Sequence, residues 1–265
     1  MTNVEAGLLA GRVPYIRGGS GRREAVVFFG ASALFRRLDE TSDPGRYARQ
    51  VSRLLPQHRF TIPGYAGAGF DEIVRHMAHV ICTPPELVVG ISFGGFVAMR
   101  FAAQYPELVR RLVLLVSAHR LSSSGWRMME RQLEALERGD LPTLIRENTL
   151  LFRRPWYNWL ALLKLWKDRD RLPARLRDPS AILRDYRQLF GPGFENNADY
   201  ARRIACPAFV IGGTADQYFD RGAFEETVGL MAGARIQFFE RETHMLPIEK
   251  CDEVAAAITD FLGQS

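Results

Sequence analysis

Several signals of membrane and disulfide-rich proteins are missing from this chain of 265 residues. No apolar run approaches the roughly 20 residues that cross a bilayer as a helix. The first 21 residues carry no basic start followed by a hydrophobic stretch, so we expect a soluble, cytoplasmic protein without stable membrane insertion. The three cysteines, Cys82, Cys206 and Cys251, are widely spaced and form no C-x-x-C pair, which predicts reduced, structural thiols.

Motifs for metals, nucleotides and nucleic acids are missing as well. The five histidines form no H-E-x-x-H or similar cluster, which predicts that there is no metal site. No G-x-G-x-x-G opens a helix and no Walker loop is present, so we expect no cofactor. The net charge of +5 comes without a recognition motif or a basic–aromatic repeat, which argues against a nucleic-acid partner.

The sequence does contain an alternation of buried-strand and helical patterns. With 47% hydrophobic and 25% charged residues, the composition is that of a globular protein that can build a core. The alternation predicts an α/β fold, with a mostly parallel twisted sheet and helices on both faces. The clearest strands are expected at Val26–Phe29, Leu87–Val89, Leu112–Ser117, Pro207–Gly213 and Arg235–Glu240.

The most informative motif is Gly90-Ile91-Ser92-Phe93-Gly94, which lies between a buried-strand pattern and a helical one. A serine on such a sharp turn sits in strained backbone, and its neighbours two residues away must lack bulk. Gly90 and Gly94 meet that need. The pattern predicts that Ser92 is a nucleophile, and the alternative is an idle serine in a glycine-rich turn.

A serine nucleophile needs a histidine base and a carboxylate, and both follow late strands of the predicted sheet. Asp216 comes after the strand at 207–213, and His244 comes after the strand at 235–240. Open α/β sheets carry their chemistry at the carboxyl ends of strands. The chain order Ser, Asp, His is therefore consistent with a catalytic triad. Asp220 and Asp252 remain alternatives for the acid.

Together these motifs resemble the α/β-hydrolase superfamily, specifically its cap-bearing, esterase-like serine hydrolases. The resemblance runs from about Val26 to Phe261. It implies an α/β-hydrolase fold in which residues 1–118 and 204–265 form the core. Residues 119–203, with helical patterns but no clear strand, would be a helical cap insertion. Ser92 would be the nucleophile, His244 the general base, and Asp216 the group that orients the imidazole.

The resemblance also implies an oxyanion hole made of two backbone N–H groups. One is the N–H of Phe93, after the nucleophile, and the other is that of Ala31, after an early strand. Relatives often carry His-Gly at this corner, whereas this chain has Phe29-Gly30, so a bracing side chain is missing. Ser32 is a candidate for a substrate contact, with turn capping as the alternative.

Four further residues complete the predicted substrate-binding set. Tyr65 lies in a glycine-rich loop that borders the pocket in the resembled family, and a plain turn is the alternative. Trp156 and Trp159 belong to an aromatic–leucine cluster, expected to be mostly cap core with one or two rings facing substrate. A helix that contacts a membrane is another interpretation of that cluster. Met245 is predicted from its place beside His244.

The positive charge is concentrated in the predicted cap. Residues 119–203 contain 17 basic and 11 acidic side chains, whereas the rest of the chain is close to neutral. Such an excess steers an anionic substrate or an acidic carrier protein, or it is a solvated face. The oligomeric state stays open.

The sequence thus predicts a serine hydrolase that cleaves a carboxylic ester, thioester or lactone of a small-molecule substrate through an acyl-enzyme. Two alternatives stay open. One is a lyase or C–C bond hydrolase that uses the same triad, and the other is a homologue that binds a ligand without hydrolysing it.

Overall fold

The structure is a computed structural model. It describes residues 4–9, 13–35, 44–65, 69–81, 83–170, 176–191, 194 and 197–264, with the backbone alone for Leu9, Ser32 and Pro44. Cys82 lies outside the described residues. Cys206 and Cys251 are both free thiols, and burial raises the pKa of Cys206 to about 11.

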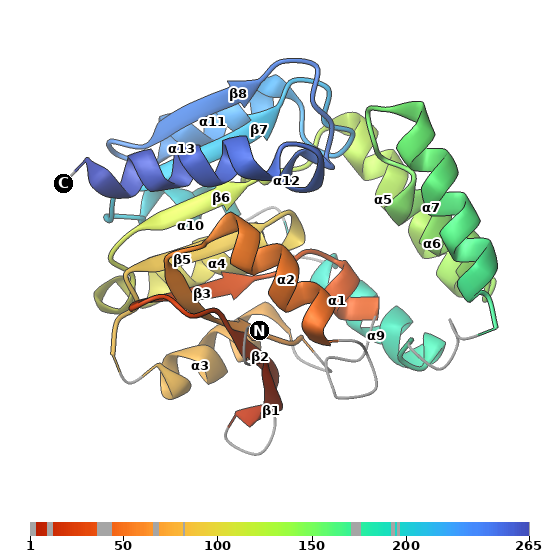
Figure 1. Cartoon of the computed structure of the whole chain (residues 1–265), viewed down its shortest axis with the longest axis horizontal. Helices are drawn as coiled ribbons and strands as arrows, with labels where there is room; N and C mark the ends of the chain where they lie inside the picture. The colour runs from red at the N-terminus through yellow and green to blue at the C-terminus, as the bar shows by residue number, and fades with distance from the viewer. Residues whose placement is uncertain are drawn as a thin grey trace.

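The described strands form one eight-stranded sheet in the order β1-β2-β4-β3-β5-β6-β7-β8 (Figure 1). β1 and β2 pair antiparallel to each other, and β2 pairs antiparallel to β4. All remaining pairs are parallel, which confirms the predicted α/β class. The strands are β1 (Glu5–Leu9), β2 (Val13–Gly18), β3 (Arg23–Phe28), β4 (His58–Pro63), β5 (Leu87–Ile91), β6 (Leu112–Leu115), β7 (Ala208–Gly213) and β8 (Arg235–Phe239).

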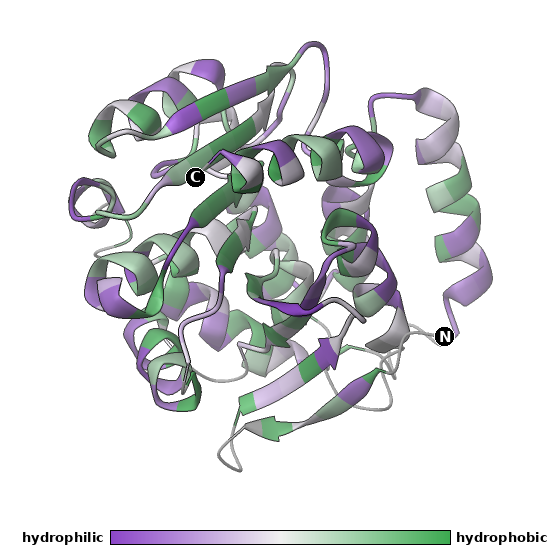
Figure 2. Ribbon diagram, turned by 60° about the vertical axis from the view of Figure 1, so that its left-hand side comes forward, coloured by the Kyte–Doolittle hydropathy of each residue, from purple (hydrophilic) through white to green (hydrophobic). Residues whose placement is uncertain are grey.

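The central strands are apolar along their whole length because both faces of the sheet are covered. Every residue of β5, β6 and β7 is buried. A continuous Val/Leu/Ile run is the signature of a parallel strand packed between two helix layers. Figure 2 shows these strands in the green of hydrophobic residues.

Helices cover both faces of the sheet. α2 and α13 contact each other on one face, and α4 packs on the other face with α3 and α10 beside it (Figure 1). The helices of these layers and of the corner after β3 are α1 (Ser32–Phe35), α2 (Pro44–Leu54), α3 (Phe70–Val80), α4 (Phe93–Gln104), α10 (Asn197–Arg202), α11 (Arg221–Leu230), α12 (Leu246–Glu249) and α13 (Cys251–Gly263).

Between β6 and β7 the described chain is helical. α5 (Ser123–Glu137) contacts α6 (Leu141–Thr149) and α9 (Pro179–Leu189), and α6 contacts α7 (Pro155–Asp168). Side-chain oxygens of Ser122, Asp140 and Asp178 each accept the N–H of the third residue of α5, α6 and α9, which fixes where these helices begin. Among the described residues, no helix is long and apolar enough to cross a bilayer.

The turn between β5 and α4 is the most constrained point of the fold. Ser92 has φ of +54°, a left-handed conformation that a residue with a Cβ rarely adopts. A Cβ on Gly94 would overlap the Phe28 carbonyl of β3, and one on Gly90 would overlap Gly95 and Ala98 of α4. The two glycines therefore let β3, β5 and α4 converge beneath the serine.

We predict that Gly94→Ala lowers the free energy of unfolding by about 3 kcal/mol or more, because its Cβ meets rigid backbone. Gly229→Ala is the matched control, since it is exposed in α11 with open space around it. We expect the control to be neutral or to stabilise by about 0.5–1 kcal/mol. Thermal and urea unfolding measure both, and equal melting temperatures would contradict the close packing described here.

Candidate active site

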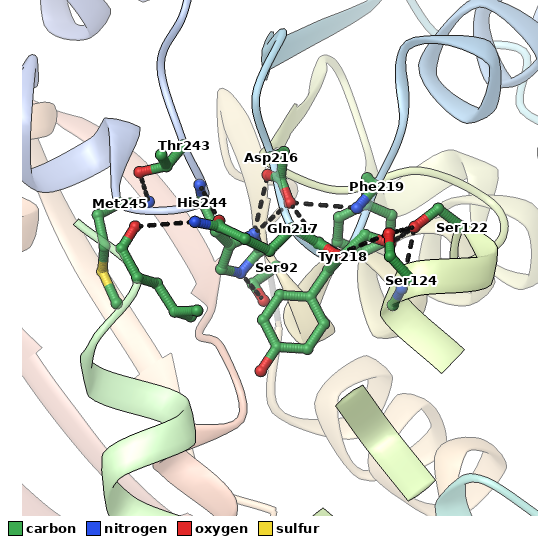
Figure 3. A network of polar contacts seen from close by, with 12 residues as sticks. Ser92, Ser122, Ser124, Asp216, Gln217, Tyr218, Phe219, Thr243, His244 and Met245 are labelled. Carbon is green, nitrogen blue, oxygen red and sulfur yellow. Dashed lines mark hydrogen bonds and ion pairs between the residues drawn. The ribbon is translucent and has the colours of Figure 1, made fainter. Parts of the chain in front are cut away.

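Three side chains from three strand ends meet in one hydrogen-bonded line (Figure 3). His244 Nε2 lies 2.7 Å from Ser92 Oγ. On the other side of the ring, His244 Nδ1 lies 2.9 Å from Asp216 Oδ2 and 3.1 Å from Oδ1. The structure therefore brings together the three residues that the sequence singled out, in an order that can move a proton off the serine.

The carboxylate of Asp216 is fully buried and held by the backbone that follows it. Its Oδ1 accepts the N–H groups of Tyr218 at 2.8 Å and Phe219 at 3.1 Å. These bonds fix the carboxylate toward the imidazole and compensate its buried charge. The alternative acids are engaged elsewhere: Asp220 caps α11, and Asp252 pairs with Arg53.

The loop that carries His244 is tied to the segment before α7. Gln217 accepts the N–H of His244 at 3.1 Å, and its amide donates to the Leu151 carbonyl at 3.2 Å. Arg153 forms an ion pair with the buried carboxylate of Glu242 at 2.6 Å. These contacts therefore hold the loop of His244 and the segment before α7 in place together.

Two backbone N–H groups lie beside the serine. Phe93 is the first residue of α4, so its N–H has no partner within the helix. Ala31 follows Gly30, where an added Cβ would stand only 3.4 Å from Ser92 Cβ. Both residues line the same cavity as Ser92 and His244. They fit donors to an oxyanion, and no bond from either N–H occurs within the described residues.

Tyr65 is placed behind these two donors rather than in the cavity. Its side chain is buried, its hydroxyl donates to the Phe29 carbonyl at 2.6 Å, and its ring packs edge-on against Phe93 at 5.4 Å. Burial raises the pKa of Tyr65, which keeps the phenol neutral. The corner at Phe29 is thus braced by a residue of the loop that follows β4.

A largely apolar cavity of about 230 Å³ opens above Ser92. Met245, which the sequence analysis placed among the substrate-binding candidates, lines this cavity. Arg46 of α2 is the arginine in the described lining, and none of the described arginines between residues 119 and 203 belongs to that lining. Apolar lining residues include Phe29, Phe35, Met129, Ile145, Leu151, Leu176 and Phe190.

Two other residues proposed from the sequence are not in the described lining of the cavity. Trp156 and Trp159 are 51% and 63% exposed on α7, and neither is in the described lining. The side chain of Ser32 lies outside the described part of the chain. His119 is buried against Thr227, with Nδ1 2.9 Å from Oγ1, and burial lowers its pKa.

Sequence reasoning missed Gln132 and Gln217. Gln132 is a buried polar residue in the apolar stripe of α5; its amide donates to the Tyr218 hydroxyl at 2.6 Å, and its carbonyl accepts from Tyr186. Its place within that stripe was a usable signal. Gln217 had only its position next to Asp216 as a clue.

A serine at the turn after β5, with an acid after β7 and a histidine after β8, places this protein in the α/β-hydrolase class. The chain belongs to the alpha/beta hydrolase family, whose model matches residues 12–257.

Relatives with assigned activities are distant. The monoacylglycerol lipase abhd6-A of Xenopus laevis is 26% identical over 66% of this chain and 54% of its own length, so the chain spans about half of that relative. A pimeloyl-(acyl-carrier protein) methyl ester esterase of Xanthomonas campestris pv. campestris is 25% identical over 83% of this chain and 90% of its own length.

Solved structures share the fold. The 2-hydroxy-6-oxo-6-phenylhexa-2,4-dienoate hydrolase of Rhodococcus sp. strain RHA1 superposes with a TM-score of 0.74 at 14% identity, covering 98% of this chain and 99% of that chain. At such identity, the likeness concerns the fold alone.

Tyr65→Phe tests whether the brace behind Ala31 and Phe93 matters to the site. We expect kcat for hydrolysis to fall roughly fivefold with KM unchanged, because the Phe29 carbonyl loses a buried hydrogen bond. Tyr105→Phe, at the far end of α4, is the matched control. A lower melting temperature with unchanged kcat would mean that the brace serves stability alone.

Proposed function

We propose that this protein is a serine hydrolase that cleaves a carboxylic ester or thioester of a small to medium substrate through an acyl-enzyme. The observation that carries the proposal is the line from Ser92 Oγ through His244 to Asp216, with contacts of 2.7 and 2.9 Å. Family membership supports a hydrolase. The two free N–H groups beside the serine support attack on a carbonyl.

In the first half of the proposed reaction, Ser92 Oγ attacks the substrate carbonyl carbon while His244 Nε2 takes the hydroxyl proton. The oxygen of the carbonyl becomes an oxyanion, which the N–H groups of Phe93 and Ala31 stabilise. His244 then gives its proton to the leaving alcohol or thiol. Asp216 holds the imidazolium and keeps Nδ1 protonated throughout.

In the second half, water attacks the acyl-enzyme. His244 takes a proton from that water, the oxyanion forms in the same place, and Ser92 Oγ leaves with the proton from His244. The carboxylic acid is released and the free enzyme returns. The residues between β6 and β7 that line the cavity, such as Met129, Ile145 and Leu151, would act as a cap that excludes bulk water.

The lining favours an apolar acyl group next to the serine. Aromatic and aliphatic side chains dominate it, and Arg46 is the arginine in its described part. The names of two relatives, a monoacylglycerol lipase and a methyl ester esterase, support a carboxylic ester as the bond that is cleaved. A C–C bond hydrolase remains the second candidate, since a relative of Paraburkholderia phymatum is a 2-hydroxy-6-oxononadienedioate hydrolase.

Ser92→Ala should lower kcat for p-nitrophenyl esters on the order of 10⁴-fold or more while the melting temperature stays near that of the wild type. His244→Ala should cost a comparable factor, and the double variant no more than either single one, because the residues act as a unit. Ser180→Ala, an exposed serine on α9, is the control.

Retention of near wild-type turnover by Ser92→Ala would refute the nucleophile assignment. Failure of the wild type on every ester, combined with turnover of a vinylogous 1,5-diketone, would favour the C–C bond hydrolase instead.

A further inference from the structure

α7 carries an apolar face whose large side chains are mostly exposed. None of its 14 residues is buried. At about 100° per residue, its five large exposed apolar side chains fall within an arc of roughly 160°. We call this arc the tryptophan face; its members are Trp156 (51% exposed), Trp159 (63%), Leu160 (43%), Leu162 (41%) and Trp166 (62%).

The position of α7 leaves this face open. The helix lies at the outer edge of the molecule, beside α6 and away from the strands (Figure 1). Its first turn is held in place by its neighbours, because the N–H groups of Arg153 and Arg154 donate to the carboxylate of Glu249. The exposed rings thus stand on an anchored helix. Contiguous exposed apolar surface of this kind marks an interaction site.

Basic side chains flank the tryptophan face. Five basic and two acidic residues lie between positions 153 and 170. Lys167 falls within the arc and has no ion pair in the described chain. The acidic groups are engaged locally, Asp168 with Lys164 at 3.4 Å and Asp170 with Arg169 at 3.7 Å. Tryptophan beside lysine and arginine is the pattern of a helix that lies in the headgroup region of an anionic bilayer.

A groove at the tryptophan face shares two lining residues with the cavity above Ser92. Leu162 and Trp166 also line an apolar groove of about 440 Å³ between α6 and α7. Ile145 and Leu176 line both this groove and the cavity above the serine. The apolar groove beside α7 thus lies next to the cavity of the proposed active site, with Ile145 and Leu176 between them.

We propose that the tryptophan face docks the protein reversibly on an anionic lipid bilayer. The convex ridge of one helix favours a fluid surface over a protein, since a bilayer needs no matching groove. The rings of Trp156 and Trp159 enter the interface, while Lys167 and Arg169 contact lipid phosphates. The docking goes beyond the proposed function and does not depend on it.

Flotation of the full chain with vesicles tests the docking. We expect the wild type to float with mixed phosphatidylcholine and phosphatidylglycerol vesicles, to bind pure phosphatidylcholine more weakly, and to be released progressively by salt. Its tryptophan fluorescence should shift to the blue on binding. Ser92→Ala should bind as the wild type does, which separates docking from the proposed catalysis.

Variants locate the contact on α7. The double variant Trp156→Gln/Trp159→Gln should lower the vesicle partition coefficient by roughly tenfold or more, and Lys167→Gln by about fivefold. Trp126→Gln on α5 and Arg110→Gln before β6 are the matched controls and should bind normally. Melting temperatures check folding, and Lys167→Gln still decides the matter if the double variant does not fold.

Three results would overturn the docking: no flotation of the wild type with anionic vesicles; equal binding by the α7 variants and their controls; or a wild-type dimer in light scattering that the double tryptophan variant converts to monomers. The last would assign the face to a second copy of the chain. Tight binding to a small acidic carrier protein without vesicle binding would assign it to a protein partner.

Discussion

The close approach of β3, β5 and α4 beneath Ser92 is the constraint on which the rest of the site depends. Gly94 packs against the Phe28 carbonyl, and Ser92 is held in a left-handed conformation that costs about 1–3 kcal/mol. That strain is offset by the buried strands on either side. This turn places the Ser92 hydroxyl and the first N–H of α4 at the cavity. The corner after β3 places Ala31 next to them.

The second half of the site depends on loops that are tied to one another. Asp216 is fixed by the two N–H groups that follow it, and Gln217 links the His244 backbone to the Leu151 carbonyl. The ion pair between Arg153 and Glu242 adds a second link. The loop that carries the base is therefore connected directly to the segment that precedes α7. If α7 docks on a lipid surface as proposed, the contacts that hold its first residues are also those that hold the His244 loop.

Much of this arrangement could be predicted from the sequence, because strand ends and glycine spacing are local signals. The fold class is confirmed, and the motifs that placed Ser92, Asp216 and His244 at strand ends correspond to side chains that meet in space. Which way a side chain faces could not be predicted. Tyr65 turns behind Phe93, and Trp156 and Trp159 point outward, because a helical period does not reveal which neighbours a helix has. The hydrogen bond from Gln132 to Tyr218 could not be predicted either, because it depends on how α5 packs against the loop after β7.

The central claim is that His244 activates Ser92 as a nucleophile. Intact-mass analysis after treatment with a fluorophosphonate tests it most directly, because covalent capture requires an activated hydroxyl. The account predicts one adduct per chain, located by peptide mapping on Ser92, and much slower labelling in His244→Gln. Absence of an adduct, an adduct on another serine, or labelling that does not depend on His244 would contradict it.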